Sequence, residues 1–181
     1  MKTVLLCIAI AFVALPSTAQ FSKAELQATG LTCAMCSNAI NKALQGVPFV
    51  ESVKADIKNS AFKMVFRENQ AVDIDALKQA VEDAGFSVGS LKLTGNFNDL
   101  KVSNDRHVQI GNTNFHFLNV NGQTLNGEST LTVVDRNFVT AKMFKKISAT
   151  TKHNCIQTGK TESCCTKEGM PANARVYHVT I

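Results

Sequence analysis

Two cysteines separated by two residues, Cys33 and Cys36, constrain this chain more than any other feature of its sequence. They lie between residues 23–29, where apolar and polar residues alternate, and residues 40–47, where apolar residues have helical spacing. The pattern therefore places Cys33 in a loop and Cys36 in the first turn of a helix, where unpaired backbone N–H groups favour thiolate over thiol. Two thiolates at this spacing can hold a soft metal ion, above all Cu(I), or can form a redox disulfide.

The elements around this pair follow a definite order. Alternating and helical patterns predict strand, helix, strand, strand, helix and strand over residues 23–29, 40–47, 53–57, 62–66, 74–84 and 90–94. Asp73 is a good N-cap for the second helix, and Gly85 fits the left-handed position that follows it. This order is typical of a ferredoxin-like βαββαβ fold, in which both helices cover one face of an antiparallel sheet. We therefore expect an α+β protein whose first domain spans residues 20–96.

Residues 22–95 resemble the heavy-metal-associated (HMA) domain of copper chaperones, metal-exporting ATPases and periplasmic mercury-binding proteins. The resemblance rests on the order of elements, on Gly85-Phe86 after the second helix, and on Gly30-Leu31-Thr32-Cys33-Ala34-Met35-Cys36. The family motif usually reads Gly-Met-Thr-Cys-x-x-Cys, so Leu31 departs from it. Methionine at that position is generally a packing residue, and leucine conserves its volume.

The resemblance implies that the sulfurs of Cys33 and Cys36 hold the ion in near-linear geometry and pass it to a partner by ligand exchange. A metal transporter or another metal-binding domain is the expected partner. Family members that prefer Zn(II) or Cd(II) commonly carry an acidic residue where this chain has Thr32, which favours Cu(I). Hg(II), which also accepts two thiolates, and Zn(II) stay open. Met35 is either a thioether ligand or a surface residue, and Phe86 either shields the sulfurs or packs in the core.

The redox alternative has less support in the sequence. Thioredoxin-like pairs usually carry Trp before the first cysteine and Gly-Pro between the two, whereas this chain has no Trp and has Ala34-Met35 between its cysteines. We therefore expect a metal-binding protein without catalytic activity, with a thiol-disulfide oxidoreductase that uses the same pair as the enzymatic alternative.

The N-terminal residues 1–19 are typical of a signal peptide. Lys2 precedes a continuous apolar run over residues 4–15, and small residues lead to a cleavage site after Ala19. The apolar run is shorter than the roughly 20 residues of a membrane span. We therefore expect a periplasmic or secreted protein that loses Cys7 with the signal peptide and keeps an odd number of cysteines.

Residues 97–181 have the pattern of a small, mostly antiparallel β domain of unknown role. A polar, turn-rich segment over residues 96–104 predicts the boundary between the domains. Short strands are predicted over residues 108–110, 114–120, 130–134, 138–147 and 175–181. This domain could dock on a membrane transporter. Most of the net charge of +5 lies here, but no segment interleaves aromatic with basic residues, so we expect no nucleic-acid partner.

A second group of chemically active residues lies in a predicted loop and consists of His153, Cys155, Cys164 and Cys165. In an oxidising compartment, Cys155 could form a disulfide with Cys164 or Cys165. The alternative is a second soft-metal site that uses the same cysteines and His153. The remaining histidines, His107, His116 and His178, stand singly in the sequence, and each is expected to be a hydrogen-bonded or exposed side chain and not a ligand.

Overall fold

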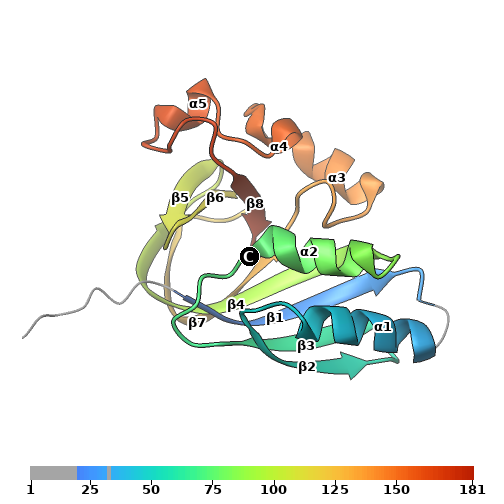
Figure 1. Ribbon diagram of the computed structural model, residues 1–181. Coiled ribbons are helices and arrows are strands. Elements are labelled where there is room, and N and C mark those ends of the chain that lie inside the picture. Colours follow the sequence, from blue (N-terminus) through green and yellow to red (C-terminus); the bar gives the residue numbers. More distant parts are fainter. Residues whose placement is uncertain (1–19, 32–33) are drawn as a thin grey trace, which may run out of the picture.

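A computed structural model describes residues 20–31 and 34–181 of the chain, and its described strands form a single mixed sheet (Figure 1). The strands are β1 (Gln20–Thr29), β2 (Val50–Asp56), β3 (Ala61–Phe66), β4 (Ser87–Val102), β5 (Arg106–Ile110), β6 (Thr113–Phe117), β7 (Gln123–Val133) and β8 (Val176–Thr180). The helices are α1 (Ala34–Gln45), α2 (Ile74–Asp83), α3 (Ala141–Ser148), α4 (Cys155–Thr158) and α5 (Ser163–Thr166). The order of strands in the sheet is β2-β3-β1-β4-β7-β8-β6-β5.

The first half of the chain has the predicted ferredoxin-like arrangement. Strands β2, β3, β1 and β4 are antiparallel neighbours, and α1 and α2 lie side by side on one face (Figure 1). Asp73 caps α2 as expected, because its carboxylate accepts a hydrogen bond from the Ala76 N–H at 3.1 Å. Gly85 follows the helix with a φ of +86°, the left-handed conformation that glycine adopts without a steric penalty.

The predicted boundary after Asn96 falls inside β4. This strand pairs with β1 as far as Asn96 and with β7 as far as Val102, so it belongs to both halves of the sheet. The pairing of β4 with β7 shifts register between Phe97 and Leu100. This irregularity accommodates the polar residues whose pattern resembles a turn, and the strand continues beyond them. The segment predicted as the boundary, residues 96–104, is therefore mostly strand. That residues 20–96 and 97–181 are separate domains stays a prediction.

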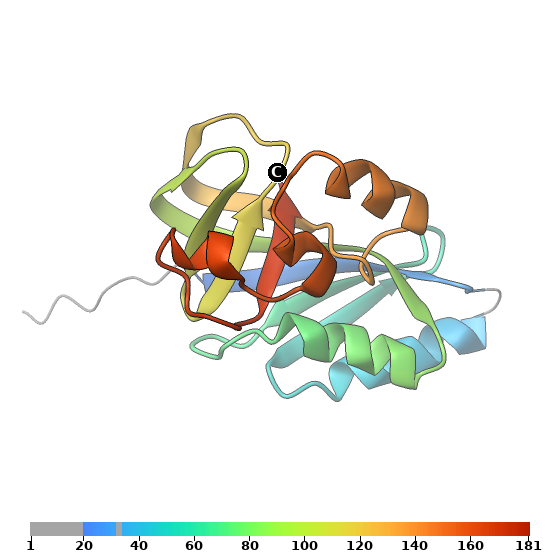
Figure 2. The ribbon, with the colours of Figure 1, turned by 90° about the horizontal axis from the view of Figure 1, so that it is seen from above.

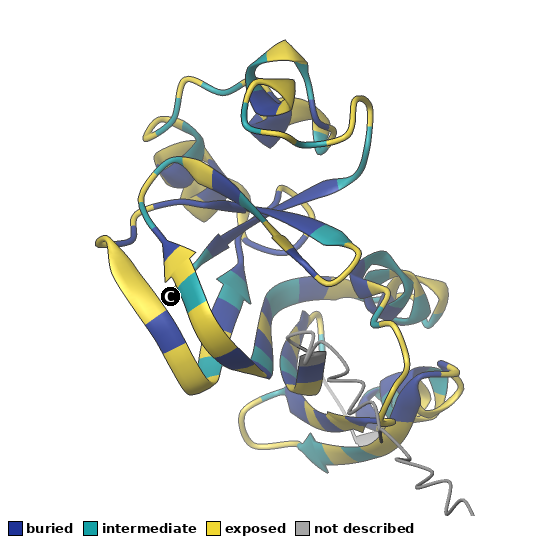
Figure 3. Ribbon diagram, turned by 90° about the vertical axis from the view of Figure 1, so that its left-hand side faces the viewer, coloured by how far each residue is buried: buried dark blue, intermediate teal, exposed yellow. Residues whose placement is uncertain are grey.

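The hydrophobic core is also continuous between the two halves. The Phe21 ring of β1 packs edge-on against Phe97 of β4 and Phe115 of β6, with ring centroids 6.1 and 5.6 Å apart. Buried and exposed positions alternate along β3, as expected for a strand with one face on the core. Figure 3 shows such bands of buried and exposed residues along the strands of the sheet. Strands β6 and β8 are buried at nearly every position, because the chain after β7 covers their second face.

The segment after β7 departs from the sequence prediction. Residues 138–147 are predicted as a strand, but their second part is α3. The Thr140 hydroxyl caps this helix by accepting a hydrogen bond from the Met143 N–H at 3.3 Å, and Phe144 and Ile147 share its buried face. The predicted loop that follows contains α4 and α5, which lie together with α3 above β8 (Figures 1 and 2).

The second half otherwise matches the predicted β structure, with one parallel pair. Strands β5 and β6 form an antiparallel hairpin, and β7 pairs with β8 in the antiparallel sense. Strands β6 and β8 are parallel, which brings the end of the chain into the middle of the sheet. In the described part of the chain, every helix is too short or too polar to cross a bilayer.

Arg175, just before β8, connects the two halves through charged hydrogen bonds. Its guanidinium donates to the Asp75 carboxylate of α2 at 2.9 and 3.2 Å and to Asp135, after β7, at 2.8 Å. It also lies over the Tyr177 ring, 3.9 Å from the centroid. Partial burial opposes ionisation of Asp75, but the hydrogen bonds from Arg175 outweigh it and lower the pKa of this carboxyl below its ordinary value.

We predict that Arg175→Met lowers the free energy of unfolding by about 2 kcal/mol, because two carboxylates lose a charged donor that serves both. Urea denaturation followed by circular dichroism measures the change. Lys23→Ala is the matched control, since the Lys23–Glu128 ion pair is more than half exposed at both ends and its loss should change stability by about 0.5 kcal/mol or less. Equal effects of the two substitutions would contradict the assignment of Arg175 as the connection between the halves.

Candidate metal sites

The first candidate site is the cysteine pair at the start of α1. Cys36 is half-buried in the first turn of this helix, as the sequence predicts. Cys33 and Thr32 lie outside the described residues, so the prediction that both sulfurs face one ion stays a prediction. The backbone enters this loop through Gly30, whose φ of +83° is a conformation that favours glycine.

The residues beside this loop have the packing roles expected for it. Leu31 is half-buried and packs against the main core, so it takes the packing role of the usual methionine. A Cβ atom at Gly30 would lie 4.0 Å from Phe86 Cδ1, which places the half-buried Phe86 ring next to the start of the loop. Met35 is 83% exposed, which identifies it as a surface residue in this structure.

The second candidate site is built from three histidines on neighbouring strands. His107 of β5 is the cross-strand partner of His116 of β6, and His116 is the partner of His178 of β8. All three side chains are buried, in the layer between the sheet and the segment that carries α4 and α5. These histidines stand singly in the sequence, but the sheet aligns them in one row. The expectation that each is hydrogen-bonded is confirmed, and the expectation that none is a ligand stays a prediction.

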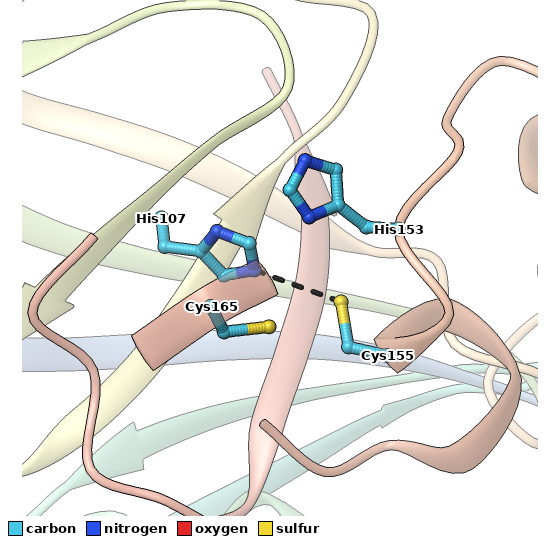
Figure 4. A group of neighbouring side chains, drawn as sticks. All are labelled: His107, His153, Cys155 and Cys165. Carbon is cyan, nitrogen blue, oxygen red and sulfur yellow. Dashed lines mark hydrogen bonds between the residues drawn. The ribbon is translucent and has the colours of Figure 1, made fainter. Parts of the chain in front are cut away.

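Cys155, the first residue of α4, meets this row of histidines. Its Sγ lies 3.4 Å from His178 Nε2, 3.6 Å from His116 Nδ1 and 3.6 Å from His107 Nε2. Its side chain is fully buried. Figure 4 shows Cys155 facing His107, with Cys165 and His153 beside them.

The donor atoms of the described residues fall into three overlapping groups, of which two share Cys155 and the third consists of Asp105, His116 and His153. Those of His116, Cys155 and His178 all lie within 4.8 Å of one another. The same holds for His107, His153, Cys155 and Cys165. Of the residues predicted for a second site, His153, Cys155 and Cys165 are therefore brought together, and the three strand histidines are added to them.

Each strand histidine is held from behind by a carboxylate. His107 Nδ1 lies 2.7 Å from Glu168, His116 Nε2 lies 3.0 Å from Asp105, and His178 Nδ1 lies 2.6 Å from Asp135. A neutral imidazole has one N–H and one lone pair, and the N–H belongs with the carboxylate. This arrangement directs the lone pair of each ring towards Cys155, as carboxylates do behind metal-binding histidines.

Burial sets the protonation of the free site. Burial and the neighbouring imidazoles lower the pKa of His116 to about 3, and burial also lowers the pKa of His107. Burial raises the pKa of the Cys155 thiol above its ordinary value. At neutral pH the imidazoles of His107 and His116 are therefore neutral and the Cys155 thiol is protonated, and this thiol can exchange its proton for a metal ion.

The predicted disulfide is not formed in this structure, because Cys155, Cys164 and Cys165 are all free thiols. Cys155 faces the histidines, while the sulfurs of Cys164 and Cys165 lie 3.6 Å apart. Cys165 is buried against Val176, and the half-buried Cys164 belongs to neither donor group that contains Cys155. These thiols are held by packing and not by a covalent bond.

One signal in the sequence could have revealed part of this site. A hairpin with the two-residue turn Gly111-Asn112 pairs residue 110 with 113 and therefore His107 with His116. No comparable local signal brings in His178, because β8 joins β6 by a parallel pairing between segments that are far apart in the chain.

Comparison with known proteins places residues 25–87 in the family model of the heavy-metal-associated domain. A copper chaperone CopZ from Staphylococcus haemolyticus is 32% identical over 59 residues, which are 33% of this chain and 85% of the chaperone. A probable copper-transporting ATPase, HMA5 of Arabidopsis thaliana, is 29% identical over 75 residues, 41% of this chain but 7% of the ATPase. This chain thus matches a small part of that ATPase.

A solved structure of a CopZ metallochaperone is 27% identical, covers 37% of this chain and 98% of its own, and has a TM-score of 0.34. The family model ends at the start of β4, so the three histidines and Cys155 all lie outside it.

We predict that, in the reduced and metal-free protein, iodoacetamide modifies Cys164 well before Cys155 or Cys165. Cys155 and Cys165 are fully buried, so the reagent does not reach them, and burial raises their pKa, so little of the reactive thiolate is present. Peptide mapping by mass spectrometry over a time course measures the order, and the same reaction in urea should remove the difference. Modification of Cys155 at the rate of Cys164 in the folded protein would contradict the described burial.

Proposed function

Because the chain belongs to the heavy-metal-associated domain family, we propose that it binds Cu(I) through Cys33 and Cys36 and transfers the ion to a partner protein. The observation that carries the proposal is the position of Cys36 in the first turn of α1, together with a copper chaperone as a relative over most of that relative's length. The helix dipole and the unpaired N–H groups of this turn favour a thiolate. Thr32 supplies no carboxylate, which favours Cu(I) over Zn(II).

Transfer by this pair is a ligand exchange. A thiolate of the partner forms a bond to the two-coordinate ion, one of the two bonds to Cys33 and Cys36 then breaks, and a second exchange completes the transfer. The oxidation state of copper does not change, so no electron donor is needed. The partner is a metal transporter or another metal-binding domain, and exposed residues beside the loop, such as Met35, are available to contact it.

We predict that Cys33→Ser/Cys36→Ser lowers the Cu(I) content by one ion per chain, because oxygen replaces both soft ligands. Titration of the reduced protein against a chromophoric Cu(I) chelator measures the stoichiometry. Met35→Ala is the matched control: it changes an exposed residue between the two cysteines and should leave the stoichiometry unchanged.

Two outcomes would contradict this proposal. Retention of full Cu(I) stoichiometry by the double variant would show that the pair is not the copper site. Turnover of a disulfide substrate by the wild type, abolished in the double variant, would identify a thiol-disulfide oxidoreductase. Parallel titrations with Hg(II) and Zn(II) decide between metals, because a mercury-binding protein should bind Hg(II) in preference to Cu(I), and a zinc site should retain Zn(II) when Cu(I) is added.

The chain is further proposed to be exported and cleaved after Ala19. Strand β1 begins at Gln20, so cleavage there would leave the described sheet intact. Intact-mass analysis of the protein recovered from the periplasm or medium should give a chain that begins at Gln20 and lacks Cys7. Recovery of the full-length mass from the cytoplasm alone would refute export.

A further inference from the structure

Three buried imidazole nitrogens face the Cys155 thiol, which has only one proton to donate in a hydrogen bond. The rings of His107, His116 and His178 each present a lone pair towards Cys155, because their N–H groups point to carboxylates. The single thiol proton can be donated to one of these three nitrogens at a time. A cation bound between the sulfur and the nitrogens would satisfy several of them together, which is why this donor set fits a metal ion.

The spacing of the donor atoms fits the same ion. A tetrahedral ion about 2.3 Å from a sulfur and about 2.0 Å from a nitrogen holds these two atoms about 3.5 Å apart. The sulfur of Cys155 lies 3.6 Å from the nitrogen of His116 and 3.4 Å from that of His178. The rings of His116 and His178 are inclined by 67°, so both can point at one centre. The His107 ring is stacked on His116, and its Nε2 lies 3.6 Å from the same sulfur, which makes His107 a candidate for a fourth ligand.

Three carboxylates surround the site, and arginines offset two of them. Glu168, Asp105 and Asp135 lie directly behind the three imidazoles. Arg106 and Arg175 offset Glu168 and Asp135 respectively, at 3.3 and 2.8 Å. A thiolate at the centre would add a further negative charge, and a metal ion would neutralise it in a buried place where an unpaired charge is costly.

We propose that Cys155, His116 and His178 bind one closed-shell thiophilic ion, Cu(I) or Zn(II), at a buried second site, with His107 or Cys165 as the candidate fourth ligand. Thiolate and imidazole together suit both ions. This site does not depend on Cys33 and Cys36.

Its position implies a different use of the metal. The first site lies at the start of α1, where Met35 is exposed, whereas Cys155 is fully covered and His153 is a 20% exposed side chain beside it. The Nδ1 atom of His153 is buried and lacks a hydrogen-bond partner among the described residues, so it could contact an ion that enters. A bound ion would join α4 to β6 and β8 and would stabilise the second half of the chain. We therefore expect a retained ion here and an exchanging ion at the first site.

The test uses the full chain carrying Cys33→Ser/Cys36→Ser, which removes the first site. The reduced protein is loaded with Cu(I) or with Zn(II) and desalted, and its mass is measured by native mass spectrometry. We expect one retained ion per chain and a higher melting temperature than for the metal-free protein. Adding Cys155→Ser should reduce the retained metal at least tenfold. Adding Cys164→Ser, the matched control, should leave it unchanged, because this neighbouring thiol belongs to neither donor group around Cys155.

X-ray absorption of the loaded double variant provides a readout that does not require Cys155→Ser to fold. The proposal expects at least two imidazole nitrogens around the ion, with one sulfur if His107 is the fourth ligand and two if it is Cys165. Equimolar competition identifies whether Cu(I) or Zn(II) is preferred. Absence of a retained ion in the folded double variant, or a shell without sulfur, would overturn the second site. Neither result bears on the first site, which is measured by the difference between wild type and double variant.

Discussion

Strand β4 hydrogen-bonds to β1 along one edge and to β7 along the other, and the rest of the described structure depends on this shared strand. Because β4 completes the ferredoxin-like half and begins the second half, the two are parts of one sheet with one main core. Arg175 reinforces the connection from outside the ladder, since it contacts a carboxylate from each half. The second half is thus held in a fixed relation to the domain that carries the family's cysteine pair.

The two candidate sites differ in accessibility and in ligand chemistry. Cys36 lies in the first turn of α1 next to the exposed Met35, where ligand exchange with a partner is physically possible. The second cluster mixes one thiol with imidazoles, is buried, and has a carboxylate behind each of its three strand histidines. Carboxylates in this position orient the rings and fix their tautomers, which is the preorganisation that a retained ion requires.

Much of the first half could be predicted because its signals are local. Periodicity, the Asp73 cap and the Gly85 terminator depend on residues within a few positions of one another, and the structure confirms them. The failures have a common cause. Residues 138–147 contain β-branched and aromatic residues that suit a strand, but the Thr140 cap and the packing of Phe144 select a helix. The polar segment after Asn96 lies in a strand because β7 supplies its hydrogen bonds.

The sequence by itself determined the element order of residues 20–94 and the position of Cys36 in the first turn of a helix, because both follow from short-range spacing. It also showed that several cysteines remain beyond that pair. Only the tertiary structure decided what surrounds Cys155. His107 and His116 meet through a hairpin, but His178 joins them through a parallel pairing, and α4 brings the thiol from a third segment. Contacts between such distant segments are selected by the packing of the whole sheet, which no local pattern encodes.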